Sequence, residues 1–251
     1  MSVETMLKQL KLPTIQRHYQ RLSDSALSES WSFSQYLSAL LEIEIEERKR
    51  GRVERYLRQS HLPLGKTLAT LNMKHFSEKV RRQTQTLLDG GFVKRAENVL
   101  AFGLPGRGKT HLAAAIGHEL ILRHGYQVFF TSTFSLVQQL LSAKANLRIE
   151  EMLKKLDRYD VVILDDIGYV QQSQEEMEVL FVFLSERYER KSLIITSNLV
   201  FGEWDKIFKN PMTTAAAIDR LVHHSVVIEM LGKSIRMAES EEERKRPERI
   251  F

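Results

Sequence analysis

A single glycine-rich stretch, Gly103-Leu104-Pro105-Gly106-Arg107-Gly108-Lys109-Thr110, constrains the fold of this chain more than any other feature. The apolar segment Asn98–Phe102 precedes it, and a segment with helical periodicity that begins at Leu112 follows it. Strand, glycine-rich loop and helix in this order form the context that a phosphate-binding loop requires. The pattern therefore predicts a triphosphate site rather than an ordinary glycine-rich turn.

Each part of this loop has a chemical role. The glycines allow backbone amides to turn toward a triphosphate, and the amino terminus of the following helix adds partial positive charge. Lys109 supplies a point charge for the β and γ phosphates of ATP, and Thr110 supplies a hydroxyl for Mg²⁺. The predicted nucleotide-binding residues are Gly103, Pro105, Gly106, Arg107, Gly108, Lys109, Thr110 and His111.

Two carboxylates follow the apolar segment Val161 to Leu164 directly. Consecutive carboxylates at the end of a buried strand are costly unless a cation or hydrogen bonds satisfy them, and Mg²⁺ bound to nucleotide phosphates would do so. We assign Asp165 to the metal shell and Asp166 to orienting the attacking water. A role in capping the helix that follows is the alternative for these acids.

Three further polar residues are candidates for the reaction. Asn198 follows the predicted strand Ser192–Thr196, and ligands of parallel sheets bind at the carboxyl ends of the strands. We expect Asn198 to position the water or contact the γ phosphate, unless it is a simple turn residue. Arg220 and Arg236 are candidates to neutralise charge in the transition state, with surface salt bridges as the alternative for each.

The region after residue 97 alternates between strand and helix patterns. Such alternation predicts a five-stranded parallel sheet covered by helices on both faces, because parallel strands need right-handed crossover connections. The predicted strands are 98–102, 127–131, 160–164, 192–196 and 225–229, and the predicted helices are 109–124, 134–143, 148–156, 174–190 and 213–222, preceded by a short helix from Ser77 to Gly90.

The first 60 residues have helical periodicity that Pro13 interrupts, and a long helix is predicted from Ser34. Residues 1–98 contain 17 Lys and Arg against 11 Asp and Glu, whereas the rest of the chain contains 20 against 21. This basic excess suggests a polyanionic partner, nucleic acid before membrane, and a solvated charged helix is an equal alternative on charge alone. The predicted DNA-binding residues are Arg48, Lys49, Arg50, Arg52, Arg55 and Arg58.

Length and composition bound the remaining possibilities. A chain of 251 residues fits one large domain with a smaller appendage, and residues 61–76 read as a linker that lies over the next domain. With no cysteine, the chain cannot form a disulfide scaffold or a Cys-ligated metal site, and its histidines show no metal-ligand spacing. No apolar run approaches the roughly 18 residues that span a bilayer, so a cytoplasmic protein is expected.

The residues Asn98 to Glu119, Asp165-Asp166-Ile167-Gly168-Tyr169 and Ile195-Thr196-Ser197-Asn198 together resemble the IstB family. Its members are AAA+ helper ATPases of insertion-sequence transposition, related to the DnaC helicase loaders. The resemblance extends over nearly the whole chain. It implies an α/β AAA+ P-loop NTPase fold with sheet order five-one-four-three-two, preceded by a small all-α domain.

The sequence pattern places a domain boundary near residue 66 and a charged tail at 239–251, and the resemblance implies a set of partners. Residues 1–65 would be the helical DNA- or partner-binding domain, 66–238 the ATPase domain and 239–251 a charged tail. The implied cofactors are ATP and Mg²⁺, and the implied partners are duplex DNA read with low sequence specificity, a DDE transposase and further copies of this chain. Lys109 and Thr110 match the Walker A positions, Asp165 and Asp166 Walker B, Asn198 sensor I, Arg220 the arginine finger and Arg236 sensor II.

Two departures from common AAA+ proteins qualify this expectation. Asp166 stands where most members have Glu, and the shorter carboxylate predicts slow or assembly-dependent hydrolysis. Only 22 residues follow Glu229, so a full helical lid and a carboxyl-terminal helix-turn-helix are not expected. The latter disfavours a DnaA-like initiator.

A DnaC-like helicase loader remains the alternative function. In that case Tyr36, Leu40 and Ile43 would form an interface with a replicative helicase rather than a domain core. A small-molecule kinase lacks support, because it would need neither Asn198 nor an arginine from a neighbouring molecule.

Overall fold

A computed structural model describes residues 2–169, 173–199, 201–204 and 211–231 of the chain. It contains two compact units, residues 1–55 and 56–251, which we call the N-terminal unit and the ATPase unit. The predicted domain boundary, near residue 66, lies about ten residues after the boundary between these two units. Arg236 and the predicted tail 239–251 lie outside the described residues.

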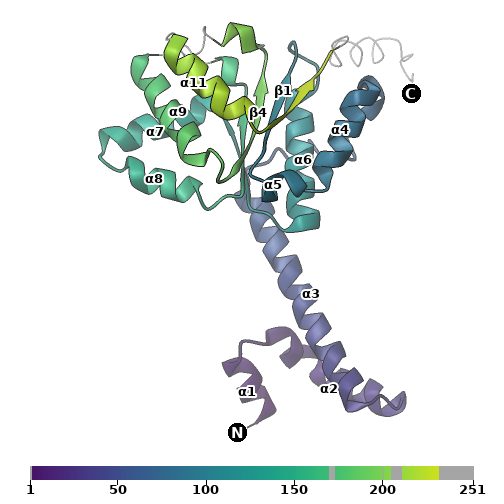
Figure 1. The fold of residues 1–251 in the computed structure, drawn as a ribbon. Coiled ribbons are helices and arrows are strands. Elements are labelled where there is room, and N and C mark those ends of the chain that lie inside the picture. Colours follow the sequence, from purple (N-terminus) through teal and green to yellow (C-terminus); the bar gives the residue numbers. More distant parts are fainter. Residues whose placement is uncertain (1, 170–172, 200, 205–210, 232–251) are drawn as a thin grey trace, which may run out of the picture. The chain divides into compact units, whose positions relative to one another are not determined.

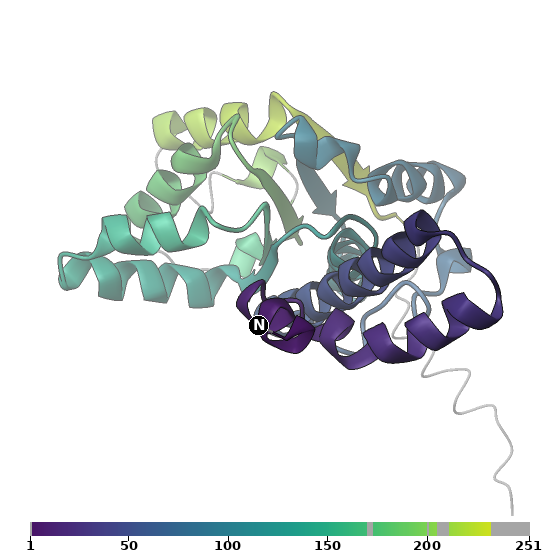
Figure 2. The ribbon, with the colours of Figure 1, turned by 90° about the horizontal axis from the view of Figure 1, so that it is seen from below.

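The N-terminal unit is helical, as predicted. It contains α1 (Val3–Gln9), α2 (Pro13–Ser28) and most of α3 (Phe33–Gln59), and Figure 2 shows α2 lying along α3. Pro13 begins α2, where the missing N–H of proline removes no helical hydrogen bond. Pro13 therefore separates α1 from α2, as the interruption of the sequence pattern indicated.

A buried carboxylate joins α2 to α3. Glu44 of α3 is only 4% exposed, and its Oε2 accepts hydrogen bonds from the backbone N–H groups of Thr14 at 2.9 Å and Ile15 at 3.0 Å. Leu12, at the N-cap position of α2, makes no side-chain capping bond, so Glu44 satisfies these free amides from a different helix. Glu44 also forms an ion pair of 2.9 Å with Arg48.

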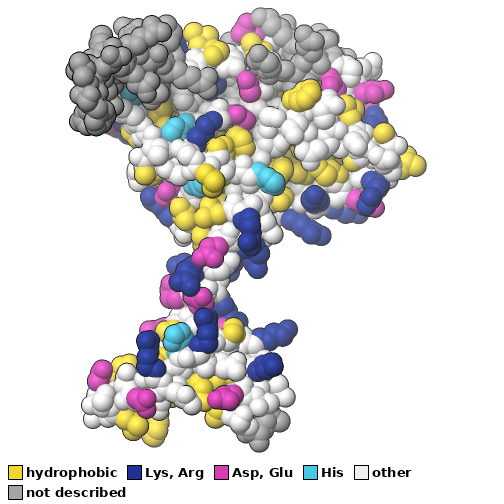
Figure 3. Space-filling view, turned by 180° about the vertical axis from the view of Figure 1, so that it is seen from behind, with side chains coloured by type: hydrophobic (Ala, Val, Ile, Leu, Met, Phe, Trp, Pro, Cys, Tyr) yellow, Lys and Arg dark blue, Asp and Glu magenta, His cyan; other side chains and the backbone are white. Residues whose placement is uncertain are grey.

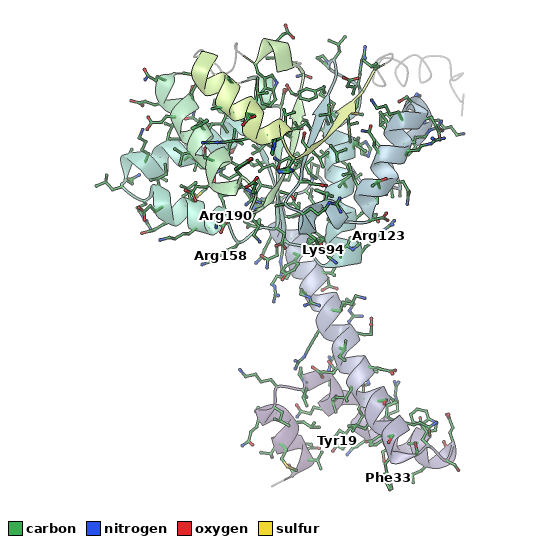
Figure 4. All side chains as sticks on the ribbon, in the orientation of Figure 1. Tyr19, Phe33, Lys94, Arg123, Arg158 and Arg190 are labelled. Atoms are coloured by element: carbon green, nitrogen blue, oxygen red, sulfur yellow. The ribbon has the colours of Figure 1, made fainter. Side chains whose placement is uncertain are left out.

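The apolar residues of α3 divide between two faces. Leu40 is buried, Tyr36 and Ile43 are half-buried, and the Tyr36 hydroxyl donates to the Tyr19 carbonyl oxygen at 3.0 Å. These three residues thus belong to the packing within the N-terminal unit, so the interface predicted for them as the alternative function is wrong. The exposed apolar residues of α3 are Phe33, which is 96% exposed and labelled in Figure 4, Leu37, Leu41 and Ile45.

The ATPase unit is built on a five-stranded parallel sheet, as predicted (Figure 1). The strand order is β2-β3-β4-β1-β5, which confirms the order five-one-four-three-two. The central strands are buried on both faces, as their apolar runs indicated. The bounds are β1 Asn98–Phe102, β2 Val128–Ser132, β3 Val161–Asp165, β4 Ser192–Ser197 and β5 Ser225–Glu229.

Helices cover both faces of this sheet. Figure 1 shows α6 (Lys109–His124) and α4 (Glu78–Leu88) on one side, with four helices on the other. Those four are α7 (Thr133–Ala145), α8 (Ile149–Leu156), α9 (Gln174–Arg187) and α11 (Pro211–Val222). The short elements are α5 (Gly91–Lys94) and the 3-10 turns η1 (Met73–His75), η2 (Ile167–Tyr169) and η3 (Phe201–Glu203).

The segment predicted as a linker packs against the ATPase unit. Leu62, Leu71 and Phe76 are buried, and the Ser60 carbonyl oxygen accepts a hydrogen bond of 2.7 Å from the backbone N–H of Phe130. The chain thus passes along the sheet after α3 before it begins α4. This path brings residues 66–72 to the phosphate-binding loop.

Candidate nucleotide-binding site

The glycine-rich loop has the backbone geometry of a phosphate-binding loop. Gly108 adopts a left-handed φ of 82° and occupies the N-cap position of α6, so that the helix begins at Lys109. Gly103 admits no side chain, because a Cβ there would lie 2.6 Å from the carbonyl oxygen of Met230. The loop therefore directs the free amides of the first turn of α6 toward one site.

Lys109 is held within this loop by oxygen atoms that carry no net charge. Its side chain is largely buried, and its Nζ donates to the carbonyl oxygens of Gly103 at 2.5 Å and Leu104 at 3.1 Å. The same Nζ donates to Asn198 Oδ1 at 2.6 Å. The loop lysine and the polar residue after β4 are thus direct neighbours.

Asn198 also binds the second of the two carboxylates. Its Nδ2 donates to both oxygens of Asp166, at 2.9 and 3.1 Å. Asn198 therefore stands between the ammonium of Lys109 and the carboxylate of Asp166. Burial and the nearby charge of Asp165 raise the pKa of Asp166, while Lys109 and Asn198 act in the opposite direction.

Asp165 ends β3 and offers an oxygen ligand beside this group. Its Oδ1 accepts a hydrogen bond of 2.7 Å from Thr196, and Oδ2 has no hydrogen-bond partner among the described residues. This carboxylate and the hydroxyl of Thr110 are both oxygen ligands of the kind that Mg²⁺ prefers. The residues present therefore fit a magnesium ion.

A cavity of about 260 Å³ brings most of these groups together, although Asp165 is not among the described residues that line it. Lys109, Thr110, Asp166 and Asn198 line it together with most of the loop residues that the sequence predicted. Its wall also contains residues from the segment that was predicted to be a linker, namely Lys66, Thr70, Leu71 and Asn72. No local pattern in the sequence marks this segment as part of a site.

His111 fastens that segment to the start of α6. Its Nε2 lies 3.1 Å from the carbonyl oxygen of Thr67 and 3.1 Å from Thr70 Oγ1. His111 lies in the cavity wall and its contacts are to protein, so its role in nucleotide binding stays a prediction. Arg107 likewise contacts protein, because its Nη1 donates to the Met230 carbonyl oxygen at 3.1 Å.

The structure does not bring Arg220 into this cavity. Arg220 lies on α11 and hydrogen-bonds to Ser185 of α9, and its guanidinium carbon lies 4.7 Å from the ring centre of Phe181. A contribution to nucleotide chemistry by Arg220 would therefore require the cavity of a neighbouring molecule. The other predicted arginine, Arg236, lies outside the described residues.

The predicted DNA-binding residues differ in their contacts. Arg48 is bound to Glu44 and the Lys11 carbonyl oxygen, and Arg50 is paired with Glu47 at 2.7 Å. Arg55 also has an interaction partner. Within the described part of the chain, Lys49, Arg52 and Arg58 make no ion pair or side-chain hydrogen bond. Figure 3 shows basic side chains interspersed with acidic ones along α3.

The sequence missed one grouping of histidines. His223 and His224 follow α11, which ends at Val222, and their ring centres lie 4.3 Å apart. Glu189 joins them, with its Oε1 3.5 Å from His224 Nε2, and all three residues are exposed. None of the described helices is long and apolar enough to cross a membrane.

Comparison with known proteins identifies the family. A profile of the IstB-like ATP binding proteins matches residues 5–243. The chain is 44% identical over 232 residues to an insertion sequence ATP-binding protein of Sinorhizobium fredii, covering 92% of this chain and 78% of that protein. It is 35% identical over 237 residues to the IS21 ATP-binding protein of Pseudomonas aeruginosa, covering 94% and 89% of the two.

A solved structure supports the fold assignment. The DnaC helicase loader matches with a TM-score of 0.55 at 17% identity, over 70% of this chain and 99% of that one, which shows a shared AAA+ fold. The profile match, the two relatives and the phosphate-binding loop agree with one another. This chain therefore belongs to the IstB-like ATP-binding proteins of insertion sequences.

Proposed function

We propose that this chain is an Mg²⁺-dependent ATPase that assembles on duplex DNA and assists a DDE transposase. The ATPase activity in this proposal is supported by two hydrogen bonds of Asn198, one from Lys109 and one to Asp166. Asn198 thus connects a phosphate-binding cation to a carboxylate that can orient water, at the carboxyl ends of the parallel strands. A site that only bound nucleotide would need the first of these groups but not the second.

Each residue of the cavity, and Asp165 at the end of β3, then has a role. Lys109 and the amides of the loop bind the phosphates, and Thr110 and Asp165 hold Mg²⁺, which neutralises phosphate charge when it is bound. Asp166 accepts a hydrogen bond from the attacking water, and Asn198 fixes the orientation of that carboxylate. Lys66, Thr70, Leu71 and Asn72 contribute the wall for the rest of the nucleotide.

Assembly follows from the position of Arg220. Since its own cavity is out of reach, we propose that Arg220 neutralises phosphate charge in the cavity of a neighbouring copy. Arg236 is proposed as a further phosphate contact. Slow hydrolysis by the isolated chain is then the expected result, with both DNA and assembly raising the rate.

The DNA-binding part rests on α3. No acid of the described residues forms an ion pair with Lys49 or Arg52, and both lie on the exposed surface of the N-terminal unit. We propose that they contact phosphates, together with Arg55 and with Arg58 at the start of the ATPase unit. Arg48 and Arg50 instead hold acids of their own helix. Phosphate contacts carry no base information, so low sequence specificity is expected.

The decisive experiment measures ATP hydrolysis by the full chain with and without nonspecific duplex DNA. Sedimentation with a non-hydrolysable ATP analogue reports assembly in parallel. Duplex DNA should raise turnover, and the protein should form large assemblies on DNA only with the analogue. Lys109→Ala should lower hydrolysis by at least about 100-fold and prevent assembly. Lys144→Ala, an exposed lysine of α7 paired with Glu178, is the matched control.

One observation keeps the helicase-loader function as a second candidate. Phe33, Leu37, Leu41 and Ile45 leave an apolar row exposed on α3, which replaces the interface first predicted at Tyr36, Leu40 and Ile43. Hydrolysis that ignores duplex DNA, by a protein that stays monomeric until a replicative helicase is added, would replace the transposition proposal with this one.

A further inference from the structure

Thr196, near the end of β4, contacts both acidic residues of the site. Its Oγ1 donates a hydrogen bond of 2.7 Å to Asp165 Oδ1. The same oxygen accepts a hydrogen bond of 2.8 Å from the backbone N–H of Asp166. Thr196 is 1% exposed and lies in the wall of the cavity. One hydroxyl therefore links the side chain of one acid to the backbone of the next.

The position of Thr196 follows from strand geometry. Leu164 of β3 pairs with Ile195 of β4, so the next residues along the two strands, Asp165 and Thr196, are neighbours. Side chains alternate along a strand, which places Thr196 and Asn198 on the same side and Ser197 on the other. Thr196 contacts Asp165 and Asn198 contacts Asp166, whereas the Ser197 hydroxyl donates to the Leu199 carbonyl oxygen at 2.7 Å.

The backbone of Asp166 requires support of this kind. Asp166 has a φ of 59°, the left-handed region that a residue with a side chain rarely adopts. The hydrogen bond from its N–H to Thr196 stabilises this conformation, which turns the chain from β3 into η2. The direction of the Asp166 carboxylate thus depends on Thr196 through the backbone and on Asn198 through the side chain.

We propose that Thr196 is a positioning residue that sets the metal-binding carboxylate of Asp165 and the water-orienting carboxylate of Asp166 relative to each other. The inference rests on the proposed function in that it assigns Asp165 to Mg²⁺. With Oδ1 held by Thr196, Asp165 presents Oδ2 to a cation. A hydroxyl is needed because the group must donate and accept at once, which valine cannot do and serine can.

The test compares Thr196→Val with Thr196→Ser in the full chain. Valine keeps the shape of threonine and removes both hydrogen bonds, whereas serine keeps the hydroxyl. Thr84→Val is the matched control, because Thr84 is also 1% exposed and its hydroxyl donates to the Val80 carbonyl oxygen within α4. Thermal unfolding identifies any variant that does not fold. If Thr196→Val does not fold, the inference is tested by Thr196→Ser, which should keep wild-type metal binding.

The first measurement is the affinity for a fluorescent ATP analogue, in EDTA and in Mn²⁺, with bound Mn²⁺ counted by electron paramagnetic resonance. The gain in affinity from metal should fall about 10- to 100-fold in Thr196→Val, which corresponds to one lost hydrogen bond to a charged group. Affinity in EDTA should change less than about threefold. Thr196→Ser and Thr84→Val should keep the wild-type gain.

The second measurement is hydrogen exchange at the Asp166 amide, which needs no nucleotide. It should become at least about tenfold faster in Thr196→Val and stay protected in Thr196→Ser. A wild-type metal gain and a protected amide in Thr196→Val would overturn the inference while leaving the proposed function intact. A wild-type chain without nucleotide affinity would overturn both, and it would do so before any variant is made.

Discussion

The two units of this protein each contain a cation near a carboxylate. The two charges are in direct contact in one unit and are separated by an amide in the other. In the N-terminal unit, Arg48 binds Glu44 directly, and Glu44 also holds two backbone amides of α2. In the ATPase unit, Asn198 stands between Lys109 and Asp166. A direct pair is satisfied within the protein, whereas an amide between two charges leaves both with capacity for a ligand. This difference separates a structural pair from a binding site.

The pKa values of the two acids follow the same division. Burial by itself would raise the pKa of Glu44, but the hydrogen bonds from Ile15, Arg48 and Thr14 outweigh it and lower the pKa below its usual value. Burial and the neighbouring Asp165 instead raise the pKa of Asp166. A group whose charge is fully compensated stabilises the fold, and one whose charge is only partly compensated is available for chemistry.

The largest effect is expected at a third charge, the buried guanidinium of Arg187. Burial lowers its pKa to about 10, and it donates to four backbone carbonyl oxygens, those of Leu156, Tyr159, Asp160 and Ser192. Arg187→Met removes these four hydrogen bonds and should lower the free energy of unfolding of the ATPase unit by about 3 kcal/mol or more. Denaturation followed by the fluorescence of Trp204, which is fully buried, measures it.

Arg190→Met is the control for this change. Arg190 is exposed, labelled in Figure 4, and paired with Asp157 and Glu186. Such surface pairs contribute about 0–1 kcal/mol. Equal losses in the two variants would contradict the structural role assigned to Arg187.

The next largest effect is expected at Asn198, whose side-chain amide lies between Lys109 and Asp166. Asn198→Asp places a carboxylate against Asp166 and beside Lys109, which creates the direct pair that the site avoids. We expect ATP hydrolysis to fall about 100-fold, because the lysine is neutralised and like charges oppose each other. Asn198→Ala removes the contacts without adding charge and should lower hydrolysis about tenfold. Similar rates in both variants would show that the amide is not needed as a neutral spacer.

The sequence predicted the parts of the fold and the site that are encoded locally. The phosphate-binding loop, the apolar run before Asp165 and the alternation of strands and helices led to the sheet and its edge residues. The contribution of Lys66 to Asn72 was missed, because it depends on where a segment without periodicity packs. Glu44 and Arg187 were missed for a related reason, since a charged residue is expected at the surface unless its distant partners are known.

A smaller effect is expected from removing the direct pair. Glu44→Gln weakens the bonds to the Thr14 and Ile15 amides and to Arg48, and should cost about 1–2 kcal/mol. Since the pKa of Glu44 is lowered by folding, the stabilisation is complete above its unfolded value near 4.5 and is lost as the pH falls through the folded value. Hydrogen exchange at the Thr14 and Ile15 amides measures this stabilisation. The variant and wild type should converge at low pH, and a constant difference would contradict this account.

The smallest effect is expected at Lys49 and Arg52, which form no ion pair with the described residues. Lys49→Glu with Arg52→Glu should reduce the salt dependence of duplex DNA binding, since each lost phosphate contact lowers the magnitude of the log-log slope by about 0.9. Lys154→Glu with Lys155→Glu on α8 changes the net charge equally and serves as the control. Arg48→Glu would not serve, because it also removes the partner of Glu44. A slope that changes only in the α8 variant would move the DNA contact to the ATPase unit and leave α3 with a structural role alone.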